Sequence, residues 1–87
     1  MDKPLEVVVK DGILSFDGRV LEHFAPTLDG STRHHVEHLS GIGLAKGLTG
    51  VKLKIRYASG IEHSFGFEEQ HRAALEELVQ AVWAAHS

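Results

Sequence analysis

Late in the chain the spacing of apolar residues changes from strand-like to helical, and this change limits the folds that are open to it. The segment 68–86 contains no Gly or Pro for 19 residues, and Leu75, Leu78, Val79 and Val82 recur in it at helical spacing. Before it, short apolar runs are separated by Gly-containing dipeptides that suit tight turns. The sequence therefore predicts several short strands followed by one amphipathic helix that packs on them.

Five dipeptides mark the predicted turns between strands. They are Asp11-Gly12, Asp17-Gly18, Asp29-Gly30, Ser40-Gly41 and Ser59-Gly60. The clearest strand between them is Val51–Tyr57, where apolar residues alternate with Lys52, Lys54 and Arg56. That alternation is typical of an antiparallel strand with one buried and one exposed face. The next apolar run follows directly after Ser59-Gly60, which predicts a hairpin.

The charge and the composition exclude several classes of function. The chain has 87 residues and a formal net charge of −3, so it offers no strong positive field for nucleic acid or anionic lipid. It has no cysteine, which excludes a disulfide framework and thiolate metal ligands and favours the cytoplasm. No apolar run approaches the roughly 18 residues of a membrane span. We expect a cytoplasmic protein that binds no nucleic acid and does not insert stably into a membrane.

The segment 31–41 contains the pattern H-x-x-E-H at His34, Glu37 and His38, which is the signature of the inverted-zincin metallopeptidases. That chemistry needs a helix, because in a helix residues four apart lie close enough to share one zinc ion. In a strand the two histidines would lie roughly 13 Å apart, at about 3.3 Å per residue. Turn dipeptides on both sides leave only a short segment, so we expect extended structure over the motif and no hydrolase.

Seven histidines are many for a chain of this length. Several fall on strand-like segments, and neighbouring strands could bring His35 or His38 close to His63. Neutral imidazoles are good zinc ligands, so these three residues are the candidate metal ligands. Exposed strand histidines without a metal are the simpler interpretation, and we expect neither a metal nor another cofactor.

The order of the apolar patterns resembles that of the bacterial pleckstrin-homology-like (PH-like) domains. The segments DGILSFDGRVLEHF, VEHLSGIGL and VKLKIRYASGIEHSFGF look like the first strands, the middle pattern and the final hairpin of that family. The resemblance covers about residues 5–86. It implies one PH-like domain over residues 1–87, mainly β (α+β by content), with a split antiparallel β-barrel of about seven short strands capped by one C-terminal amphipathic helix. The implied strands lie near residues 5–10, 13–16, 19–24, 33–38, 42–46, 51–58 and 61–67, and the helix at about 68–86.

Domains of this family are mostly binding scaffolds, and a fold alone does not fix a function. Members that bind phosphoinositides use several cations in the first hairpin, whereas that hairpin here has only Lys10 and Arg19, flanked by Asp11 and Asp17. The sequence therefore argues against lipid headgroups as partners. We expect a non-enzymatic protein-interaction or scaffold module, with a histidine-based metal- or small-ligand-binding domain as the alternative.

A protein partner or a second copy of the chain is the expected binding partner, because a split barrel has edge strands that can pair with another strand. The predicted contact surface has two parts. One is the exposed side of the C-terminal helix, including Trp83, and the other is the strand face formed by Lys52, Lys54 and Arg56.

Overall fold

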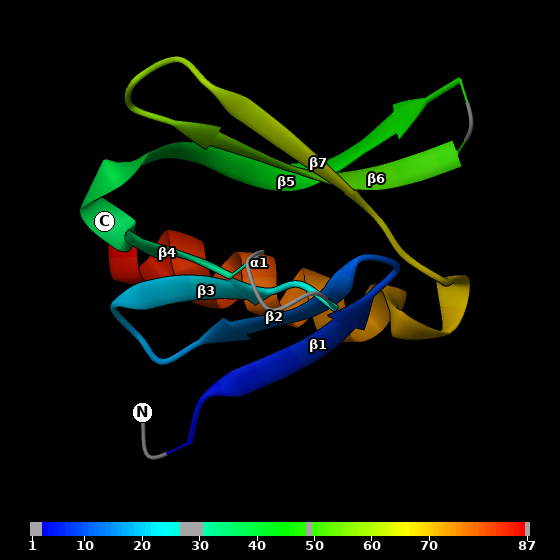
Figure 1. The fold of residues 1–87 in the computed structure, drawn as a ribbon, viewed down its shortest axis with the longest axis horizontal. Coiled ribbons are helices and arrows are strands. Elements are labelled where there is room, and N and C mark those ends of the chain that lie inside the picture. The colour runs from blue at the N-terminus through cyan, green and yellow to red at the C-terminus, as the bar shows by residue number, and fades with distance from the viewer. Residues whose placement is uncertain (1–2, 27–30, 49, 87) are drawn as a thin grey trace.

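The computed structural model describes residues 3–26, 31–48 and 50–86, and its strands form two antiparallel sheets (Figure 1). Sheet A contains β1 (Leu5–Val9), β2 (Gly12–Phe16), β3 (Val20–Phe24) and β4 (Thr32–His35), side by side in chain order. Sheet B contains β5 (Leu39–Gly47), β6 (Gly50–Tyr57) and β7 (Glu62–Gly66), also in chain order. A single 3₁₀ turn, η1 (Val36–His38), joins the sheets, and a second, η2 (Glu69–His71), leads into the helix α1 (Arg72–His86).

The prediction of a mostly β chain with one C-terminal helix is confirmed. The strands do not form a closed barrel within the described residues. At one end, the backbone N–H of Lys10 donates to the carbonyl of Gly66 over 2.9 Å and links the end of β1 to β7. The regular helix begins at Arg72 rather than near residue 68, because η2 occupies the intervening residues.

The core lies between the inner faces of the two sheets and α1. Leu14 and Phe16 of sheet A and Leu53 and Ile55 of sheet B are almost wholly buried. The helix adds the side chains that its periodicity predicted to face the core, which are Leu75, Leu78 and Val82. Because these residues pack on the sheets, α1 lies against β1, β5 and η1, and in Figure 1 it runs across the view behind sheet A. Within the described residues, no helix has the length and apolar character needed to cross a membrane.

Two expectations for the middle of the chain are wrong. The predicted strand over 33–38 ends at His35, whose Nδ1 accepts the N–H of Glu37 at 3.2 Å and caps η1. The N–H of Val36 still donates to the carbonyl of Arg19 at 2.7 Å, so the chain leaves sheet A only after this residue, through η1. Ser40-Gly41 is not a turn, because it lies inside β5 at a shift of register where Ser40 is the extra residue.

Three of the predicted turns are confirmed by glycines with positive φ, at Gly12, Gly18 and Gly60. Asp29-Gly30 lies outside the described residues. The turn after β2 is held by Asp17, whose Oδ1 accepts the N–H groups of Val20 and Arg19 at 2.8 Å each. These two hydrogen bonds favour the carboxylate and lower the pKa of Asp17.

We expect Gly12→Ala to destabilise the protein more than Gly60→Ala. Both glycines have a positive φ, which costs an alanine about 1–2 kcal/mol. Only at Gly12 would the added Cβ also overlap the backbone carbonyl of Phe24, whereas at Gly60 it would enter open space. Urea unfolding of the two variants beside the wild type measures the difference. Equal losses would show that β2 and β3 move apart at little cost.

Candidate functional site

A hollow of about 430 Å³ lies at the corner between the edge strand β4 of sheet A and the β6–β7 hairpin of sheet B. We call it the histidine pocket. Its lining comes from β4, η1, the end of β6 and the hairpin into β7, and consists of Thr32, His34, His38, Tyr57, Ala58, Ser59, Ile61 and His63. Among the described residues that line it there is no Lys, Arg, Asp or Glu. The pocket is therefore a mainly apolar and aromatic hollow whose polar atoms come chiefly from imidazoles.

A chain of ring contacts spans the gap between the sheets at this corner. The ring of His34 in β4 lies 4.1 Å from that of Tyr57 in β6, measured between ring centroids. Tyr57 meets His63 of β7 edge to face at 5.2 Å, and His63 is followed by Phe65 at 6.5 Å. Phe65 then meets His23 of β3 edge to face at 4.7 Å, which returns the chain of contacts to sheet A. Aromatic side chains thus link the sheets at this corner.

His34 is the polar group of this pocket that the protein satisfies least well. Its Nε2 is buried and has no hydrogen-bond partner among the described residues. Burial of the ring lowers the pKa of His34, and the nearby His63 and His38 lower it further by repelling a positive charge. Burial also raises the pKa of Tyr57, which keeps its hydroxyl neutral. The neutral form of each group is favoured, so the wall formed by His34 and Tyr57 is uncharged near neutral pH.

The H-x-x-E-H motif is divided between two hollows. His34 in β4 and His38 in η1 both line the histidine pocket. Glu37 instead lines a second hollow, so its carboxylate is not beside the two imidazoles. No group of three His, Asp or Glu side chains within the described residues is arranged to hold a metal ion. The motif therefore lacks the shared geometry that a metal-bound water and its general base need.

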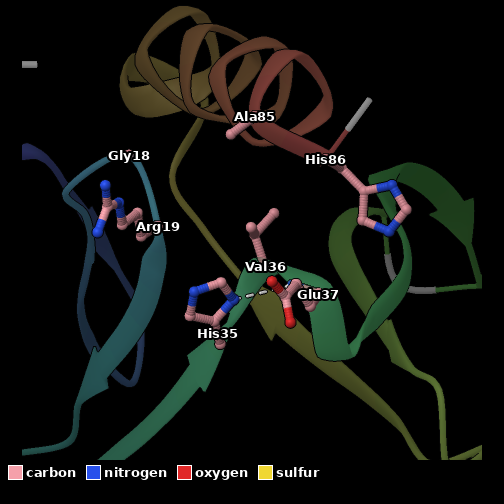
Figure 2. A pocket seen from close by; sticks show the side chains of 7 residues that line it. All are labelled: Gly18, Arg19, His35, Val36, Glu37, Ala85 and His86. Carbon is pink, nitrogen blue, oxygen red and sulfur yellow. Dashed lines mark hydrogen bonds between the residues drawn. The ribbon is translucent and has the colours of Figure 1, made fainter.

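The second hollow, shown in Figure 2, is wider and polar, with a volume of about 700 Å³. It lies between the β2–β3 turn, η1 and the end of α1, and Arg19, His35, Glu37 and His86 contribute to its wall. Its imidazoles already have partners. His35 Nδ1 accepts the N–H of Glu37, and His86 Nε2 donates to the carbonyl of Leu39 at 2.7 Å. Because these groups are occupied in bracing η1 and α1, the histidine pocket is the stronger candidate site.

The candidate metal ligands from the sequence do not meet at one point. His38 and His63 line the histidine pocket, whereas His35 lines the polar hollow, with its ring 6.3 Å from that of His38 between centroids. The sequence indicated His35 as a candidate ligand, whereas the structure places His34 in the pocket. The two differ because neighbouring residues of a strand point to opposite faces. The sequence contained one signal for His34: it lies two residues before the apolar Val36, which is buried, and residues two apart in an extended segment share a face. Tyr57 and Ile61 were also missed as site residues.

The predicted partner-binding residues lie on two separate surfaces. Lys54 and Arg56 face outward from β6 and pair with Glu62 of β7, at 3.8 and 3.0 Å. Lys52 lies on the same face of the strand. Trp83 is 43% exposed, and its indole N–H donates to the carbonyl of Ile42 at 2.9 Å. Trp83 therefore joins α1 to the edge of β5, which leaves only part of its ring for another molecule.

Comparison with protein-family models, with curated proteins and with solved structures gave no match for this chain. The function must therefore be argued from the pocket and the surfaces themselves.

We expect the free energy of unfolding to decrease as the pH is lowered from 8 to 5, and we expect His34 to cause part of this decrease. Its pKa is lower in the folded chain than the ordinary value of about 6.5. The unfolded chain therefore takes up the proton more readily, so this contribution is complete above the ordinary pKa and is lost as the pH falls through the folded pKa. His34→Phe keeps a ring against Tyr57 but does not titrate, and its unfolding free energy should fall less over this range.

At pH 8 the same variant should be more stable than the wild type by about 1 kcal/mol, because it removes a buried nitrogen without a partner. His34→Gln serves as the control, since it removes the titration but retains polar atoms. Urea unfolding at both pH values measures all three proteins. If both variants showed the same pH dependence of the unfolding free energy as the wild type, that dependence would come from groups other than His34.

Proposed function

We propose that this chain is a non-enzymatic protein-interaction module of PH-like arrangement, which binds an apolar or aromatic side chain of a protein partner in the histidine pocket. The order of four antiparallel strands, three antiparallel strands and a closing helix supports the PH-like part of the proposal. The observation that carries the binding function is the pocket itself, which is lined by rings, Ile61 and small side chains and has no Lys, Arg, Asp or Glu among its described lining residues.

The size and the chemistry of the pocket suit one anchoring side chain. Its volume of about 430 Å³ lies within the usual range for ligand pockets, roughly 300–1,000 Å³. Protein partners often place one aromatic or aliphatic anchor in such a hollow and surround it with weaker contacts. Ile61, which is 57% exposed at the rim, would be covered by an occupant. Covering this side chain and the neighbouring rings would supply the hydrophobic part of the binding free energy.

Its position at the sheet edges also supports a protein partner. The pocket lies beside β4 and β7, and in the part of the chain that the structure describes each of these strands has a paired neighbour on one side only. An extended partner segment could place its side chain in the pocket while its backbone approaches one of these edges. The separation of Glu37 from His34 and His38 supports a binding role rather than a hydrolytic one.

N-acetyl-tryptophanamide tests the pocket without knowledge of the partner, because it presents a single aromatic side chain with a peptide-like backbone. We expect it to shift the amide resonances of His34, Tyr57 and His63, with a dissociation constant on the order of 1 mM. N-acetyl-lysinamide should bind much more weakly, since its ammonium group would lose water against an apolar wall.

Ile61→Ser should weaken binding of N-acetyl-tryptophanamide about five-fold, because about 1 kcal/mol of apolar contact is removed. Leu48→Ser is the matched control, since Leu48 is also highly exposed but does not line the pocket. Its affinity should equal that of the wild type. Binding that is equally strong with the lysine amide, or unchanged in Ile61→Ser, would contradict the proposal.

A further inference from the structure

Three large apolar side chains lie in a row across the outer face of sheet A. Val8 of β1 pairs with Ile13 of β2, and Ile13 pairs with Phe24 of β3. The residues on both sides of Val8 are buried, as is Leu14 beside Ile13, and Phe24 lies on the same face as Ile13 because the two are paired in register. The three side chains therefore point away from the core. They are 49%, 37% and 41% exposed, respectively. Adjacent exposed side chains of this size form a continuous apolar strip, which is a feature of interaction surfaces.

A charged row lies next to this strip on the same face. Glu6 of β1, Ser15 of β2, Glu22 of β3 and Arg33 of β4 are opposite one another in register. The row thus has an acidic end on one edge strand and a basic end on the other. The ion pair that Arg33 makes with Glu22 is long, at 3.8 Å, and the Arg33 side chain is 69% exposed. Arg33 therefore remains accessible to a second acidic group.

From these two rows we infer that the outer face of sheet A binds the same face of a second copy of the chain, about a twofold axis that runs parallel to the strands between β2 and β3. Such an axis places β1 of one copy over β4 of the other and β2 over β3. Glu6 then faces the partner copy's Arg33 twice in the dimer, and Ile13 faces the partner copy's Phe24 twice. The face is self-complementary in charge and in apolar contact, as a twofold interface requires.

The geometry is that of two sheets packed face to face, as in a β-sandwich. The face spans four short strands, so the interface falls at the small end of the known range, below about 1,200 Å² of total buried surface. We therefore expect a weak, concentration-dependent dimer. Because the Glu6–Arg33 contacts lie on exposed strands, added salt should weaken the dimer further. This inference is independent of the histidine pocket, which lies between the sheets.

Sedimentation velocity of charge-reversal variants over a wide concentration range tests the arrangement. Glu6→Arg places two basic residues against each other in the homodimer, and Arg33→Glu places two acidic residues there. Each variant alone should dimerise about ten-fold more weakly than the wild type, which corresponds to about 1.4 kcal/mol. An equimolar mixture should recover the wild-type association, because every contact in the mixed dimer then joins an acid to a base.

Ile13→Ser and Phe24→Ser should also weaken association, while Leu48→Ser and Ile61→Ser should leave it unchanged. Far-UV circular dichroism of each variant establishes that it is folded. A wild type that stays monomeric at every concentration would overturn the inference. A wild-type dimer that the charge variants do not weaken, or that their mixture does not restore, would overturn it as well.

Discussion

The two sheets are held together mainly by side chains, and the rest of the structure depends on this constraint. Among the described residues, the hydrogen bond from Lys10 to Gly66 links the end of β1 to β7. No strand of sheet A described in the structure is paired along its length with a strand of sheet B. Leu14, Phe16, Leu53 and Ile55 instead join the sheets in one buried cluster. A structure of this kind leaves corners where the sheets diverge, and each corner must be covered by something other than a strand.

The two corners are covered in different ways, and the difference accounts for the pocket. At one corner α1 contributes a continuous apolar face, and Trp83 and His86 donate hydrogen bonds to the carbonyls of Ile42 and Leu39 at the edge of β5. At the other corner a chain of ring contacts that begins with His34 and Tyr57 spans the sheets and leaves a hollow beside it. This hollow is the histidine pocket. The Nε2 of His34, which is buried without a hydrogen-bond partner among the described residues, belongs to a residue that lines it.

How far the sequence predicts this structure depends on whether each segment carries its own signal. The strand β6 and the helix α1 were predicted well, because alternation and helical spacing are properties of single segments. The end of β4 was not predicted, since the segment 32–38 contains no Gly or Pro that would mark the start of η1. The choice of His35 over His34 had a similar origin. The side chains from Thr32 to His35 are all polar or imidazole, so the inward face is shown by the pairing of His34 with the buried Leu21 and by the position of Val36 two residues later.

The apolar strip of Val8, Ile13 and Phe24 was equally hidden in the sequence, because Val8 and Ile13 sit in apolar runs that resemble core and Phe24 ends a short strand-like segment. Register alone separates them from Val7 and Leu14, which are buried one position away. The same alternation governs β4, where Arg33 belongs to the outer charged row and His34 to the inner pocket. Adjacent residues of one strand thus serve opposite faces. A partner in the pocket and a second copy on the outer face would not compete for space, so both could be held by the same small sheet at once.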